Sequence, residues 1–176
     1  VTDTAANMNK AGNFLAEHDG INYHYCFDHV LELTTKLAYG EGAGEFSSCL
    51  AKARKLVGYF NSSTKATENL RQCQRTIEDM LKAEDDEYVQ KSVVNMIQDI
   101  RTRWWSTLAM IARLLRLRVS ITSLSPTLPV DHLLLEAEWT LIEQLHTILK
   151  PFKDIQQRME GQKYVTVSMV PHCVYL

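Results

Sequence analysis

Apolar residues recur at intervals of three and four from residue 46 almost to the end of this chain, and this spacing constrains the fold more than any other feature. Such spacing places the apolar side chains on one face of a helix. It predicts five consecutive helices, whose apolar faces are formed by Phe46, Leu50, Val57 and Phe60; by Leu70, Cys73, Ile77, Met80 and Leu81; by Val89, Val93, Met96, Ile97 and Ile100; by Trp104, Leu108, Ile111, Leu115 and Val119; and by Leu134, Ala137, Leu141, Leu145 and Ile148.

Turn formers and prolines mark where these helices are expected to end. The first stops at residues 61–64, the fourth at the Ser-Pro pair 125–126, and the fifth near Pro151, since proline interrupts helices. A short sixth helix is expected around residues 155–159, and a kinked helix over residues 164–176.

The first 39 residues have a different pattern. Residues 1–3 are typical of a strand end, residues 5–17 of a helix, and the alternation over residues 21–27 of a strand. A helix with Val30, Leu33 and Leu37 on one face should follow, and then three glycines between residues 40 and 44. The predicted fold is mostly α with a small α/β part: an α/β segment over residues 1–39, a glycine-rich linker over 40–45 and a helical domain over 46–176.

Composition removes several classes of protein. With 176 residues, 45% of them hydrophobic and a formal net charge of -2, the chain is neither wholly disordered nor a basic nucleic-acid tail. No apolar run reaches the ~20 residues that span a bilayer. The four cysteines are far apart, which favours reduced thiols over a disulfide framework. Because the chain starts inside a presumed strand, we expect it to be part of a longer protein.

Charge is unevenly distributed. Six acids fall between Glu78 and Glu87, whereas no acid occurs between Asp99 and Asp131. The acid-free stretch is a candidate phosphate-facing surface, with Arg101, Arg103, Arg113, Arg116 and the aromatic Trp104 as its candidate contacts. The competing interpretation is structural: the arginines pair with the acidic run, and Trp104 belongs to the core.

Three further residues are candidates for site chemistry. Asp3, at a strand end, suits either a metal ligand or a helix cap. Cys26 and His29 have the spacing of half a zinc site, but no second pair of ligands lies at suitable spacing. A buried cysteine with a polar or capping histidine is the interpretation we prefer.

Five sequence blocks, taken in order, resemble the hAT family of DNA transposases. They are residues 1–11, 26–33, 54–63, 99–107, and the pair 149–152 with 164–168. The family patterns they resemble are Thr-Asp-Asn-Ala-Ser-Asn-Met-x-Lys-Ala, Cys-x-x-His-x-Leu-x-Leu, Arg-x-x-Val-x-x-Phe-x-x-Ser, Asp-x-x-Thr-Arg-Trp-Asn-Ser-Thr, and Leu-x-Pro-Phe followed by Tyr-x-Thr-x-Ser. Thr4, Ala6 and Trp105 depart from these patterns, which fits a host protein derived from a transposase.

The resemblance implies a partial ribonuclease-H-like segment followed by an all-helical insertion domain. It also implies DNA as partner, a nuclear location, and Mg²⁺ or Mn²⁺ held by two Asp and one Glu in an intact parent. Of those carboxylates only Asp3 is present, so the fragment alone is not expected to cut or join DNA. Trp104 occupies the position that can stack on an unpaired base. Homo-oligomers would form through segments outside these residues. A non-catalytic DNA- or protein-binding module is the alternative, and a helical scaffold with a vestigial core is a third possibility.

Overall fold

The computed structural model describes residues 6–20, 26–40, 42–85 and 87–159, and everything regular in them is helical. The helices are α1 (Ala6–Asp19), α2 (Phe27–Tyr39), α3 (Glu45–Ser62), α4 (Thr64–Glu84), α5 (Trp104–Ser123), the short 3-10 turns η1 (Ser125–Thr127) and η2 (Val130–His132), and α6 (Glu136–Met159). No strand occurs among the described residues, so the helical prediction is confirmed and the α/β part is not observed.

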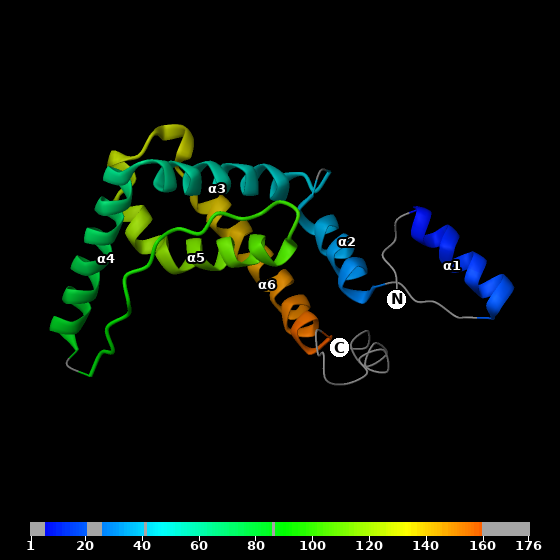
Figure 1. Ribbon diagram of the computed structural model, residues 1–176. Helices are drawn as coiled ribbons and strands as arrows, with labels where there is room; N and C mark the ends of the chain where they lie inside the picture. The colour runs from blue at the N-terminus through cyan, green and yellow to red at the C-terminus, as the bar shows by residue number, and fades with distance from the viewer. Residues whose placement is uncertain (1–5, 21–25, 41, 86, 160–176) are drawn as a thin grey trace.

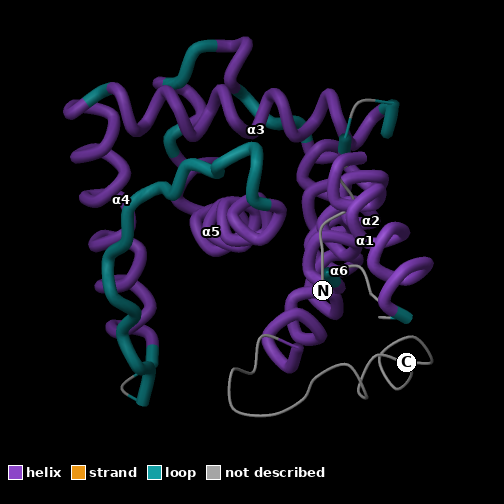
Figure 2. Tube along the Cα trace, turned by 45° about the vertical axis from the view of Figure 1, so that its right-hand side comes forward, coloured by secondary structure: helices purple, strands orange, loops and turns teal. Residues whose placement is uncertain are grey.

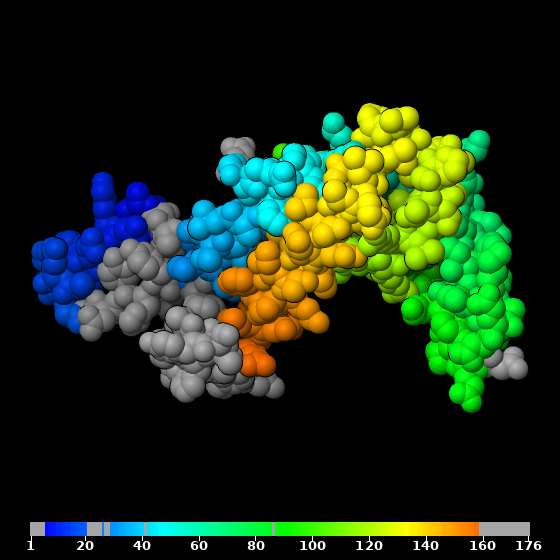
Figure 3. All heavy atoms as spheres, turned by 180° about the vertical axis from the view of Figure 1, so that it is seen from behind, coloured from blue at the N-terminus to red at the C-terminus, as the bar shows by residue number. Residues whose placement is uncertain are grey.

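Helix α6 is the centre of the assembly, because α2, α3 and α5 all pack against it. Helix α3 runs above α5 in the view of Figure 1, and α4 turns away from the C-terminal end of α3 while keeping contact with α5. Seen from behind, the molecule is an arch with α1 at one end and the tip of α4 at the other (Figure 3). No described helix is both long and apolar enough to span a bilayer.

The core lies between α3, α5 and α6. Its innermost side chains include Leu50, Leu56, Val57 and Phe60 from α3, Met110, Ile111 and Leu114 from α5, and Ile142 and Leu149 from α6. Leu108 is buried as well, and Leu115 packs against this core, as the 3.6-residue spacing predicts.

The third predicted helix is wrong. Residues 87–103, which we call the 87–103 segment, form an irregular connection that runs back along α4 before reaching α5 (Figures 1 and 2). Side chains of neighbouring helices bond to its backbone. Gln74 of α4 receives a hydrogen bond from the Val94 N–H at 2.9 Å and donates one to the Val94 carbonyl at 2.9 Å.

A carboxylate holds the segment at a second point. The Lys91 N–H donates to Glu78 at 2.7 Å, and the Tyr88 hydroxyl donates to the same carboxylate oxygen at 3.1 Å. These tertiary bonds satisfy backbone groups that a helix would have paired internally, and they override the apolar spacing. Of the stripe that suggested a helix, Met96 is buried, whereas Val89 is exposed.

Pro151 does not end a helix, contrary to prediction. Helix α6 continues through it to Met159 and absorbs the short sixth helix. Proline supplies no N–H for the carbonyl four residues earlier, which is one lost hydrogen bond. Leu149 before it is fully buried and Phe152 after it packs against the core. We attribute the continuity to this packing on both sides of the proline.

The predictions for the N-terminal residues are confirmed only in part. Helix α1 matches the predicted helix over residues 5–17 within two residues at its end. The expected strand over 1–3, the first five residues of the strand expected over 21–27, and the C-terminal helix over 164–176 lie outside the described residues. Phe27, expected to end a strand, begins α2 instead.

Helix α2 buries a different face from the predicted one. Leu31, Thr35 and Tyr39 are buried, while Leu37, from the predicted apolar face, is 82% exposed. Helix α2 packs on α3, α5 and α6.

Candidate nucleic-acid interface at the start of helix α5

A tight turn over residues 100–103 leads into α5. The Arg103 N–H donates to the Ile100 carbonyl at 2.8 Å, closing the turn. The Ser106 hydroxyl accepts the Ile100 N–H at 2.8 Å, and its own proton has two acceptors in reach, the carbonyls of Ile100 at 2.9 Å and of Arg103 at 2.6 Å. The serine thereby satisfies backbone groups at the first turn of the helix, as a capping residue does.

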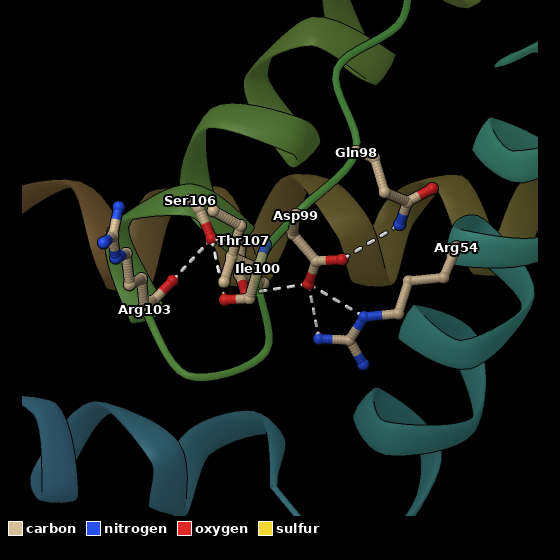
Figure 4. A network of polar contacts seen from close by, with 7 residues as sticks. All are labelled: Arg54, Gln98, Asp99, Ile100, Arg103, Ser106 and Thr107. Atoms are coloured by element: carbon tan, nitrogen blue, oxygen red, sulfur yellow. Dashed lines mark hydrogen bonds and ion pairs between the residues drawn. The ribbon is translucent and has the colours of Figure 1, made fainter.

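Asp99, directly before this turn, is the centre of a buried polar network (Figure 4). Its side chain is only 1% exposed. Arg54 of α3 donates Nε–H and Nη2–H to Oδ2 at 2.8 and 2.6 Å. The Thr107 hydroxyl donates to the same oxygen at 3.0 Å, and the Gln98 amide donates to Oδ1 at 3.1 Å. Burial acts to raise the pKa of Asp99, but these donors outweigh it and hold that pKa below its ordinary value.

The turn presents charged and aromatic side chains to solvent. Arg101 and Arg103 are exposed, and Trp105 is 39% exposed. The Arg103 guanidinium carbon lies 6.0 Å from the centre of the Trp105 ring, and Lys153 Nζ of α6 lies 5.6 Å from it. Both separations are within cation–π range. We call Arg101, Arg103, Trp105 and Lys153 the Trp105 patch.

A groove of roughly 840 Å³ adjoins Arg101 and runs between α2 and α3. Three cationic side chains, Lys36, Arg54 and Arg101, line it, and no described lining residue is acidic. The Lys36 charge is matched by Glu32 at 2.6 Å and that of Arg54 by Asp99. Arg101 therefore supplies the charge of this groove that no described ion pair offsets.

Trp104, the predicted stacking residue, is placed in the core with 2% of its surface exposed. A ring covered in this way cannot stack on a base without leaving the core, so the structure supports the competing interpretation of Trp104. The exposed aromatic is its neighbour Trp105, since adjacent residues of a helix point about 100° apart. The residue order Arg-Trp-Trp could have raised this possibility, but sequence spacing cannot say which tryptophan faces outward.

Arg113 and Arg116 bind the backbone of the 87–103 segment. Arg113 donates to the carbonyl of Asn95, and Arg116 donates to the carbonyl of Ser92 at 2.8 Å. The ion pairs of the described residues do not join either arginine to the acidic run 78–87, which is the pairing that the competing interpretation expected. Sequence reasoning missed this role because arginine–carbonyl bonds leave no complementary charge to find in the sequence.

The candidate metal residues are not brought together in what the structure describes. Asp3 lies outside the described residues. Cys26 is half-buried just before α2 and makes no side-chain cap bond, and His29 Nδ1 lies 4.0 Å from a carboxylate oxygen of Glu32. Across residues 6–20, 26–40, 42–85 and 87–159, no three His, Cys, Asp or Glu side chains gather to hold a metal ion.

This arched helical domain, in which the sequence blocks that begin at Arg54 and Asp99 meet, belongs to the class of proteins derived from hAT transposases, as its similarity to known proteins shows. The family model of the ZBED1 RNase-like helical domain matches residues 24–148, and the chain belongs to that family. The chain is also 26% identical over 171 residues to the human Zinc finger BED domain-containing protein 4. That match covers 97% of this chain but only 13% of the human protein. No solved structure matches.

Proposed function

We propose that this domain binds DNA through the Trp105 patch, as the helical part of a nuclear, transposase-derived host protein. The observation that carries the proposal is the exposed Trp105 ring, which lies within cation–π distance of Arg103 and Lys153. Arg101, on the same pinned turn as Arg103, is a third cation of the patch and is exposed. Arginine and lysine bind phosphate oxygens, and an aromatic face stacks on unpaired bases, typically for ~1–3 kcal/mol per base.

Arg101 and Arg103 are the main phosphate contacts in this proposal. Arg113 and Arg116 are secondary contacts, because each already donates to a backbone carbonyl and offers only its remaining N–H groups. Trp105 replaces Trp104 as the stacking residue, since Trp104 is buried.

Catalysis is a separate proposal that concerns a longer parent only. Asp3 would supply one of three carboxylates for Mg²⁺ or Mn²⁺, and the resemblance alone supports this assignment. The described residues offer no cluster that fits such an ion, and Asp3 lies outside them. A homo-oligomer through other segments of the parent rests on the same resemblance.

The proposal is tested by titrating fluorescently labelled duplex and single-stranded DNA with the 176-residue chain at several salt concentrations. The joint variant Arg101→Ala with Arg103→Ala should weaken duplex binding and reduce the salt slope by about 1.8, which is ~0.9 for each lost phosphate contact. Trp105→Ala should weaken single-stranded binding more than duplex binding, since unpaired bases are the ones that stack.

The matched control is Arg75→Ala with Lys82→Ala, which removes two positive charges from α4, away from the patch. If this control lowers affinity as much as the patch variant does, binding reflects net charge alone and the proposal is wrong. A wild-type chain that binds neither form of DNA would instead favour the protein-binding module.

A further inference from the structure

We infer that Arg54 is a positioning residue for DNA binding: its ion pair with Asp99 fixes the 100–103 turn and so orients Arg101 and Arg103 before DNA arrives. The inference rests on the proposed function and assigns a role to a residue of α3 that lies far from the patch in sequence. Arg54 is already engaged with a carboxylate, so it acts through Asp99 rather than on the nucleic acid itself.

Asp99 is held firmly in one place. Four N–H or O–H groups from three residues, Arg54, Thr107 and Gln98, converge on a carboxylate that is almost fully buried. The Arg54 side chain is itself only 19% exposed. Breaking such a pair from one side leaves a buried charge without its partner, which is strongly unfavourable. Asp99 therefore has one favourable position.

The position of Asp99 is transmitted to Arg101 and Arg103 through the 100–103 turn. Ile100 follows Asp99 directly, and its N–H is accepted by the hydroxyl of Ser106. Thr107, the next residue of α5, donates to Asp99 itself. The 100–103 turn is thus held at its N-terminal end by Asp99 and at its C-terminal end by the first turn of α5. Figure 4 shows the Arg103 side chain pointing away from Asp99. This side chain is exposed to solvent.

An ordered turn should increase the affinity for DNA. Immobilising a flexible side chain or loop at an interface costs conformational entropy, which weakens association. A turn that is already ordered in the free protein avoids this loss. A loosened turn keeps both arginine charges but presents them in many arrangements. Affinity should then fall even though the net charge of the patch is unchanged.

The decisive variant is Asp99→Asn, because two effects predict opposite results. Removing a negative charge near a DNA-binding surface should strengthen binding by simple electrostatics. Loss of the pinned turn should weaken it. We expect about threefold to tenfold weaker duplex binding, together with faster hydrogen exchange of the Arg103 amide that closes the turn. Equal or tighter binding by Asp99→Asn would overturn the inference.

Glu138→Gln is the matched control. It makes the same charge change at a more exposed ion pair of α3, with Lys52 at 2.8 Å, and touches no residue of the turn. It should leave DNA affinity and Arg103 exchange unchanged while lowering stability. Equal weakening by both variants would mean that stability, not positioning, controls binding, and would also contradict the inference.

Arg54→Lys covers the case in which Asp99→Asn does not fold. Lysine keeps the positive charge but loses the paired N–H groups that bind Oδ2, so affinity should fall and Arg103 exchange should rise. Unchanged affinity in this variant would overturn the inference. If the wild-type chain binds no DNA, the proposed function is wrong. If the wild-type chain binds DNA and both Asp99→Asn and Arg54→Lys bind it with the same affinity, only the positioning role is wrong.

Discussion

Arg54 and Asp99, 45 residues apart in the chain, meet in an ion pair in which two guanidinium N–H groups bind one carboxylate oxygen. Each is the first residue of a block that resembles the transposase family, 54–63 in one case and 99–107 in the other. The two blocks therefore form one structural unit, which joins the middle of α3 to the start of α5.

The stability of the chain should depend on this pair in acid. The folded-state pKa of Asp99 is lowered, so its contribution is present above the unfolded pKa of about 3.9 and is lost as pH falls through the folded value. The free energy of unfolding should fall as pH drops below about 4, and Asp99→Asn should flatten that fall. Urea unfolding at a series of pH values measures this; identical slopes for both proteins would contradict it.

The two adjacent tryptophans should separate stability from binding. Trp104→Ala removes a buried side chain and should lower the free energy of unfolding by ~3–5 kcal/mol. Trp105→Ala, at a partly exposed position, should change it by less than ~1 kcal/mol while weakening single-stranded DNA binding. Chemical denaturation of both variants is the measurement, and a greater stability loss in Trp105→Ala would reverse the assignment.

Gln74 should contribute more than any other α4 side chain to holding the 87–103 segment against α4. It pairs with both backbone groups of Val94 and is buried, so Gln74→Leu leaves the Val94 N–H and carbonyl without those partners. We expect a loss of ~1–3 kcal/mol for each group left unsatisfied and faster exchange of the Val94 amide. Gln72→Leu, on the same helix, is the control; equal losses would show that Val94 finds other partners.

Arg113→Ala should destabilise the chain even if Arg113 never contacts DNA. Its bond to the Asn95 carbonyl is charge-assisted, and losing it should lower the free energy of unfolding by ~1.5–3 kcal/mol. Arg75→Ala, which breaks exposed contacts on α4, should stay within about 0.5 kcal/mol. An Arg113→Ala protein of unchanged stability would show that the 87–103 segment is not held at this point.

Cys49 should react slowly with thiol reagents in the folded protein. Burial, aided by Glu138, raises the pKa of its thiol to about 11. The reactive thiolate is then a small minority at pH 8, and alkylation should accelerate when the chain is unfolded. The pKa of the Cys49 thiol is higher in the folded chain than in the unfolded chain. Its contribution to the free energy of unfolding is therefore present below about pH 9 and is lost as pH rises through the folded value. Mass spectrometry after timed alkylation measures the rate, and equal rates in both states would contradict burial.

The helical domain was predictable because local rules and burial agree there. The apolar positions of α3 and α5 lie on one face at helical spacing, and the turn formers at 61–64 and 125–126 fall where the helices end. The Arg101 and Arg103 candidates also follow from sequence, because an acid-free arginine stretch can be read directly. Arginine side chains usually face solvent, so both residues were candidates for surface contacts.

The remaining errors arise where a distant side chain decides the outcome. Apolar spacing alone predicts a helix over residues 89–100, but Gln74 and Glu78 capture the backbone of that stretch. Nothing local distinguishes Trp104 from Trp105, and the packing of α5 against α6 and the rest of the core buries the first. Helices α3 and α5 and the identity of the charged stretch were thus determined by the sequence itself, since these features depend on neighbouring residues. Which tryptophan is exposed, and the carboxylate that Arg54 meets, were decided by tertiary structure, because both depend on contacts between residues far apart in the chain.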